Sequence, residues 1–169
     1  MWRAATIGVL AFAACPLVQA QSTASYEIAE AQGHVETCLS EVQSGERDAR
    51  SCIGASVAPC STDAITTVDM LSCIEPELVI WDERLNAAYA ELLRVYGEQD
   101  LEDDPIRALA PRLEQVQTQW RTWRDAKCGF AYAQFRGGSM GRITGSDCHL
   151  RETGLRALEL EALLEDAQL

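Results

Sequence analysis

Residues 117–128, QTQWRTWRDAKC, place two tryptophans three positions apart and end on a cysteine. Apolar residues continue upstream of them at alternating steps of three and four, which is the spacing of one face of an α-helix. This face consists of Ile106, Leu109, Leu113, Val116, Trp120 and Trp123. We therefore predict a long central helix whose tryptophan-bearing face is buried, with the rest of the chain packed around it. Asp104 followed by Pro105 predicts its start, because a cap residue and a first-turn proline favour a helix N-terminus.

The remaining apolar residues also recur at helical spacing, and no segment alternates with period two between turns. The pattern predicts helices over about residues 26–42, 46–55, 77–97 and 147–167, with a further helical turn or two over 67–73. Pro76 suits the first turn of the helix that follows it, and Gly97 suits the end of that helix. The glycine-rich run 137–141 separates the central helix from the last one. We predict an all-α fold, a compact bundle of about five helices.

The cysteines indicate a disulfide framework. Of the seven, six remain once Cys15 is assigned to a leader, and an even number is typical of disulfide-bonded exported proteins. We predict three bonds, each closing a short unit of the chain: Cys38–Cys52, Cys60–Cys73 and Cys128–Cys148. The alternative for the first four cysteines is Cys38–Cys73 with Cys52–Cys60. Zinc binding is disfavoured because no two cysteines have the spacing C-x2-C or C-x4-C.

The first twenty residues have the features of a signal peptide. A short positive start, Met1-Trp2-Arg3, precedes an apolar run that ends in the small-x-small sequence Val18-Gln19-Ala20. We predict cleavage there and export to the bacterial periplasm or the cell exterior. Residues 12–15, FAAC, also resemble a lipoprotein cleavage box, so a lipid anchor at Cys15 stays open. No later segment is apolar enough to span a membrane.

The chain is strongly acidic, with a formal net charge of −12. A surplus of carboxylates repels phosphate, which argues against nucleic acid and anionic membranes as partners. The same charge would attract a basic protein.

Several motifs, taken together and in order, have a familiar pattern. They are Cys60-x12-Cys73, Asp82-x2-Leu85-Asn86-x2-Tyr89-x2-Leu92, Gln117-x2-Trp120-x2-Trp123-Arg124-Asp125-x2-Cys128, Gly137-Gly138-Ser139 and Cys148-x4-Thr153-x2-Arg156-x2-Glu159-Leu160. The chain thereby resembles the LprI-type lysozyme-inhibitor N-terminal domain family of small exported bacterial proteins. The resemblance implies a disulfide-bonded helical domain over residues 60–169, with lysozyme inhibition as the family's namesake activity. Residues 21–59 would form an N-terminal helical extension packed with that domain into one unit.

Charged residues of the tryptophan motif and of the last helix are expected to stabilise the fold and not to form a binding site. We predict that Arg124, Asp125, Arg156 and Glu159 make a partly buried salt-bridge network between the two helices. Trp120 and Trp123 are predicted to pack in the core.

Two segments are candidates for binding a partner. The first is the glycine loop, with Gly137, Gly138, Ser139 and Arg142, because loops held by a rigid scaffold often carry function. The second is the acidic run with Asp100, Asp103 and Asp104, which could meet a cationic partner or cap a helix. This run lacks the ligand order of an EF-hand, so calcium binding is disfavoured.

Catalysis is not expected. Ser139, Asp147 and His149 are close in sequence but lack the context of a nucleophile elbow, and we predict no catalytic residues, cofactor or metal. The function we predict is partner binding, with inhibition of a basic lysozyme by surface contact as the specific hypothesis. The alternative is an envelope structural or accessory protein of another partner without inhibitory or enzymatic activity.

Overall fold

The computed structural model describes the backbone of residues 16–45, 47–101 and 105–169, and the side chains of residues 27–45, 47–101 and 106–169. Five α-helices follow one another: α1 (Pro16–Gln43), α2 (Val57–Cys60), α3 (Thr67–Asp100), α4 (Ala110–Ala133) and α5 (Ser139–Ala167). Two 3-10 segments, Ala49–Cys52 and Pro105–Arg107, precede α2 and α4. No strand occurs within these described ranges, which confirms the all-α fold. Residues 1–15 of the predicted leader, Cys15 included, lie outside them.

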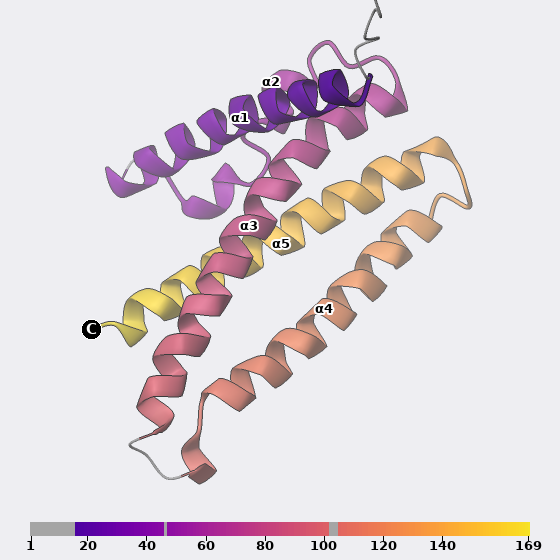
Figure 1. The fold of residues 1–169 in the computed structure, drawn as a ribbon. Coiled ribbons are helices and arrows are strands. Elements are labelled where there is room, and N and C mark those ends of the chain that lie inside the picture. Colours follow the sequence, from indigo (N-terminus) through magenta and orange to yellow (C-terminus); the bar gives the residue numbers. More distant parts are fainter. Residues whose placement is uncertain (1–15, 46, 102–104) are drawn as a thin grey trace, which may run out of the picture.

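Helix α3 is the element on which the others pack. Figure 1 shows it crossing between α1 on one side and the hairpin of α4 and α5 on the other, and α5 lies against it along much of its length. Trp81, Leu85 and Leu92 of α3 meet Leu150 and Leu160 of α5 in a core where all five are almost fully buried. Each such side chain contributes roughly 1.5–3 kcal/mol through its removal from water.

Helix α3 is longer than the sequence pattern predicts. It begins with a capping box, in which the Thr66 hydroxyl accepts from the Asp69 N–H and the Asp69 carboxylate accepts from the Thr66 N–H. Pro76 lies inside this helix, so the prediction of a fresh helix at Pro76 is wrong. A mid-helix proline costs about 3 kcal/mol, but the disulfide at Cys73 before it and the buried Glu77 after it hold both sides in place. The predicted stop at Gly97 is also wrong, because α3 runs on to Asp100.

Helix α4 starts later than predicted. Pro105 belongs to the separate 3-10 segment, and α4 begins at Ala110 with Pro111 in its first turn, where a missing N–H is harmless. Asp100, the last residue of α3, supplies the cap. Its carboxylate accepts hydrogen bonds from the N–H of Leu109 at 2.7 Å and from that of Ala110 at 2.9 Å.

The predicted buried face of α4 is right for Leu113 and Trp120 and wrong for its other four residues. Leu109, Val116 and Trp123 are 44–50 % exposed, and Ile106 is more exposed still. The inner face instead carries Leu113, Gln117, Trp120, Arg124 and Cys128, which are buried or half-buried. The prediction followed the largest apolar side chains and passed over two polar residues, Gln117 and Arg124, which bond to α5.

The last helix begins eight residues before its predicted start, at Ser139 instead of Asp147. Gly141, which was part of the predicted break, lies within α5 together with Gly145, and both glycines let Tyr132 of α4 approach closely. A Cβ on Gly141 would lie 2.8 Å from the Tyr132 carbonyl oxygen, inside the contact limit. These glycines are therefore packing contacts between the two helices.

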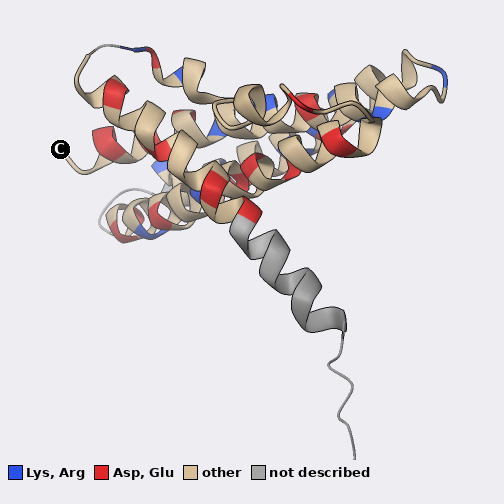
Figure 2. Ribbon diagram, turned by 90° about the horizontal axis from the view of Figure 1, so that it is seen from above, with Lys and Arg blue, Asp and Glu red and all other residues tan. Residues whose placement is uncertain are grey.

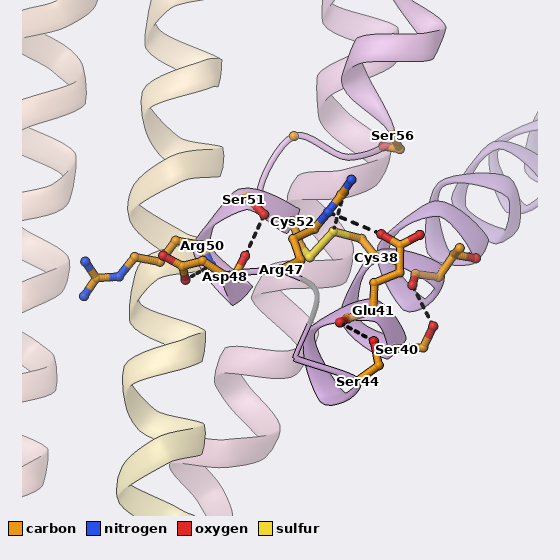
Figure 3. Close-up of a disulfide and its surroundings, with 12 residues drawn as sticks. Cys38, Ser40, Glu41, Ser44, Arg47, Asp48, Arg50, Ser51, Cys52 and Ser56 are labelled. Carbon is orange, nitrogen blue, oxygen red and sulfur yellow. Dashed lines mark hydrogen bonds and ion pairs between the residues drawn. A yellow bond between two sulfur atoms is a disulfide. The ribbon is translucent and has the colours of Figure 1, made fainter.

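Three disulfides join these elements, with the pairing that spacing favours: Cys38–Cys52, Cys60–Cys73 and Cys128–Cys148. The first, shown in Figure 3, ties α1 to the 3-10 segment that follows it. Among the described residues of the helix predicted over 46–55, only Ala49–Cys52 is helical, and it is a 3-10 turn capped by the Asp48 carboxylate. The third disulfide links α4 to α5.

Candidate contact site at the tip of the helical hairpin

The tryptophan motif sits at the interface of α4 and α5. The Trp120 ring lies between two guanidinium groups, with the Arg124 and Arg156 Cζ atoms 5.0 Å and 5.8 Å from its centroid. Arg124 donates to the Thr153 hydroxyl at 3.2 Å, and Arg156 donates to the Gln117 side-chain oxygen at 2.9 Å. Both bonds cross between the helices.

The salt bridges of this motif do not cross between the helices as predicted. Arg124 pairs with Asp125 on α4, and Arg156 pairs with Glu159 on α5. Neutral partners make the interhelical links because buried arginines need acceptors, and a hydroxyl or amide oxygen serves without burying a second charge. These side chains are thus engaged with one another, and the motif has a structural role.

A buried carboxylate that the sequence analysis missed joins the N-terminal segment to α3. Glu77 is fully buried, and its two oxygens accept four hydrogen bonds. The donors are the Gly54 N–H, the N–H and hydroxyl of Ser56, and the Trp81 indole N–H, at 2.6–2.9 Å. The four-residue spacing of Glu77 and Trp81 was visible in the sequence, but nothing marked Gly54 and Ser56 as their partners.

The hairpin of α4 and α5 ends in a short loop, residues 134–138, at one extremity of the molecule (Figures 1 and 2). Arg136 adopts a left-handed conformation with φ of 49°, and Gly137 follows with φ of 87°. The Gly138 N–H donates to the Phe135 carbonyl at 2.9 Å and closes the turn. The Cys128–Cys148 disulfide and the glycine contacts with Tyr132 hold the two helices together behind this loop.

The hairpin tip, which we define as residues 130–142, exposes large apolar side chains. Phe130 is 67 % exposed and Met140 52 %, and Tyr132 and Phe135 are also exposed. All four predicted contact residues of the glycine loop lie in this tip: Gly137, Gly138 and Ser139 at its apex, and Arg142 one turn into α5. The apolar residues escaped the sequence analysis because helical spacing alone does not separate an outer apolar face from an inner one.

A shallow groove of about 420 Å³ runs beside the tip, where α3, α4 and α5 meet. It is lined by Leu71, Glu75, Asp125, Cys128, Gly129, Tyr132, Arg142, Gly145, Ser146 and His149. Burial holds the pKa of His149 below its usual value, and the nearby Arg124 charge lowers it further. Ser139 lies about 15 Å along α5 from His149 by helix rise, and the Asp147 carboxylate pairs with Arg151. These residues therefore do not form a catalytic triad.

Asp100, the described contact residue of the acidic run, lies at the other end of α4. Asp100 uses both carboxylate oxygens to cap that helix, and Asp103 and Asp104 lie outside the described residues. A helix of 24 residues spans about 36 Å. Asp100 and the glycine loop therefore do not form one surface.

Within the described ranges, no group of three or more His, Cys, Asp or Glu residues is arranged to hold a metal ion. None of the described helices is long and apolar enough to cross a bilayer.

Comparison with known proteins gives a family match and two relatives. A family model described as lysozyme inhibitor LprI matches residues 59–160. The chain is similar to an uncharacterized protein of Rhizobium meliloti (strain 1021), with 28 % identity over 114 residues, 65 % of this chain and 82 % of that protein. It is also similar to an uncharacterized 17.7 kDa protein of the puhA 5' region of Rhodobacter capsulatus, with 29 % identity over 119 residues, 66 % of this chain and 74 % of that one. No solved structure matches.

Proposed function

Because the chain belongs to the LprI family of lysozyme inhibitors, we propose that it is an exported binding protein that inhibits a lysozyme by contact and has no catalytic activity of its own. Three disulfides support export, since such bonds persist in oxidising compartments outside the cytosol. We place the protein in the bacterial periplasm or outside the cell. The domain that carries the activity would be residues 60–169, with residues 21–59 as its extension.

The hairpin tip is the surface that we assign to the enzyme. The shape and composition of this tip are the main support for the proposal. The tip lies at one extremity of the molecule, a disulfide holds its two helices together, and its aromatic side chains are exposed. Phe130, Phe135 and Met140 are of the residue types enriched at the centres of protein interfaces. A loop braced by a disulfide loses little conformational freedom on binding, so more of the contact energy appears as affinity.

The acidity of the rest of the molecule has a different role in this proposal. Figure 2 shows Asp and Glu residues distributed along the helices, and the whole chain has a net charge of −12. A field of that sign accelerates the approach of a basic lysozyme without requiring any one carboxylate in the contact. Asp100 is unsuited to direct contact, because its oxygens already serve α4.

An inhibition assay tests the proposal. Purified, oxidised mature protein is titrated into a cell-wall lysis assay with several lysozymes, at low and at moderate salt. We expect inhibition at micromolar concentrations that weakens as salt screens the long-range attraction. If no lysozyme is inhibited at either salt concentration, the inhibitor proposal is wrong.

The alternative function, an envelope accessory protein with another partner, is favoured by one observation. The family match begins at residue 59, and the Cys38–Cys52 unit lies outside it. A chain with this extension could have exchanged the family's partner for a different one. Failure to inhibit any lysozyme, combined with a folded disulfide-bonded protein, would support this second function.

A further inference from the structure

The hairpin tip differs in charge from the rest of the chain. Between Asp125 and Asp147 the sequence has three basic residues and no acidic one, although the whole chain has 26 acidic and 14 basic residues. Lys127 is neutralised by Glu152, with 2.6 Å between nitrogen and oxygen. Arg136 and Arg142 are exposed, and neither side chain has an ion pair or hydrogen bond to another described residue. Two guanidinium groups without an ion pair thus lie in the longest acid-free stretch of the hairpin.

The backbone at the apex is also unusual. Arg136 is the only described residue other than glycine with positive φ. Residues with a Cβ rarely adopt this conformation, and such outliers concentrate at functional sites where the surrounding structure holds them. Here the hydrogen bonds of the turn and the Cys128–Cys148 disulfide hold it. The turn therefore presents a long cationic side chain at the outermost point of the hairpin.

A lysozyme has the complementary distribution of charge. Glycoside hydrolases flank the scissile bond with a pair of carboxylic residues inside a cleft. A basic lysozyme therefore has a positive exterior and a negative catalytic centre. The acidic body of this chain matches the exterior, and the cationic tip matches the centre.

We infer that the hairpin tip enters the lysozyme cleft and that Arg136 and Arg142 pair there with the catalytic carboxylates. This inference rests on the proposed function and assigns its contact chemistry. Guanidinium groups suit the task because they stay charged at any physiological pH and bind carboxylates through two parallel hydrogen bonds. Phe135 and Met140, exposed beside them, supply apolar surface for the walls of the cleft.

A double-mutant cycle between inhibitor and enzyme tests the inference. The inhibitor variants are Arg136→Gln with Arg142→Gln, and Arg121→Gln as a control that removes a charge from an exposed position on α4 outside the tip. The enzymes are lysozyme and its inactive form in which both catalytic carboxylates are replaced by amides. Affinity is measured by titration calorimetry, so that the inactive enzyme can be compared directly.

We expect the double variant to bind lysozyme about 10- to 100-fold more weakly, as for a lost charge-assisted contact. Wild-type inhibitor should bind the amide enzyme more weakly than lysozyme by a similar factor. The double variant should bind the two enzymes with nearly equal affinity. Arg121→Gln should behave like wild type in both. Arg136→Gly, which suits positive φ, repeats the test with the turn preserved, and circular dichroism checks that each variant is folded.

The outcomes separate the two proposals. If wild type inhibits lysozyme and the double variant binds equally well, the inference is wrong and the inhibitor function stands. If wild type binds no lysozyme, both the inhibitor function and the inference are wrong. Vesicles of phosphatidylcholine with phosphatidylglycerol provide the remaining arm. Retention of wild type but not of the double variant on them, with unchanged lysozyme binding, would assign the tip to a lipid surface and overturn the inference.

Discussion

The two ends of α4 use their charged residues in opposite ways. At the N-terminal end, Asp100 caps the helix with both carboxylate oxygens, so its charge stabilises the fold. At the C-terminal end, Arg136 and Arg142 have no partner among the described residues, and Phe130 is 67 % exposed. A charged residue next to a helix end is thus not in itself a sign of a binding site. What distinguishes the two ends is whether the side chains are already satisfied within the chain.

The two ends should also respond differently to mutation. Changes at the Asp100 end are expected to alter stability and leave inhibition intact. Changes to exposed residues of the hairpin tip are expected to alter inhibition and leave stability intact. The variants below test this separation, from the largest expected effect to the smallest.

Removing the Cys128–Cys148 disulfide should have the largest effect. The bond closes a segment with a sequence separation of 20 residues, and the chain-entropy estimate for its loss is about 3 kcal/mol. The double variant Cys128→Ala with Cys148→Ala should show this loss in urea unfolding. Because the hairpin is no longer braced, inhibition should weaken as well. Unchanged stability would mean that the packing of Gly141 and Gly145 on Tyr132 suffices to hold the hairpin.

Truncating Phe130 should weaken inhibition by about tenfold, or roughly 1.4 kcal/mol, which is the scale of an interface aromatic residue. The free energy of unfolding should stay within about 0.5 kcal/mol of wild type, because the ring is exposed. Val116→Ala is the matched control, since Val116 is an exposed apolar residue of α4 outside the tip. Equal inhibition by Phe130→Ala and Val116→Ala would remove the tip from the contact.

Replacing Asp100 by alanine should lower the free energy of unfolding by about 1 kcal/mol, the typical value of a helix cap. Inhibition at moderate salt should be unchanged, because Asp100 acts within the fold. Thermal unfolding and the lysis assay measure the two effects on the same sample. A loss of inhibition larger than the loss of stability would show that this end of α4 contacts the enzyme after all.

The smallest expected effect is a pH dependence from His149 in the groove beside the tip. Its pKa is lowered in the folded protein, first by burial and then by Arg124, so the unfolded chain binds the proton more tightly. Stability should therefore decrease as pH falls from the ordinary histidine pKa of about 6.5 through the lower folded value. Urea midpoints between about pH 8 and about pH 5 should show a decline that His149→Gln reduces. An equal decline in both proteins would assign it to other groups.

Much of the fold could be predicted because its signals are local. The helices follow from apolar spacing, and each disulfide closes a short unit between Cα atoms 5.4–5.6 Å apart. The position of the glycine loop at the end of a hairpin followed from Cys128 and Cys148 on either side of it.

The orientation of α4 could not be predicted in the same way. Its outer face carries Val116 and Trp123, while its inner face carries Gln117 and Arg124. The partners that justify burying those polar side chains, Thr153 and Arg156, lie on α5 and are distant in sequence. The spacing of apolar residues along one helix cannot predict polar pairs between two helices. For the same reason the tip was recognised as a loop but its exposed aromatic residues were not.

The buried carboxylate of Glu77 limits where this chain can be truncated without loss of the fold. Three of its four hydrogen-bond donors come from Gly54 and Ser56, upstream of the residue at which the family match begins. A protein trimmed to the matched region would keep only the Trp81 donor, so the Glu77 carboxylate would lose three of its four hydrogen bonds and the segment that covers it. We therefore expect the homology boundary at residue 59 to fall inside a single cooperative unit, and expression of the matched region alone to yield a poorly folded product.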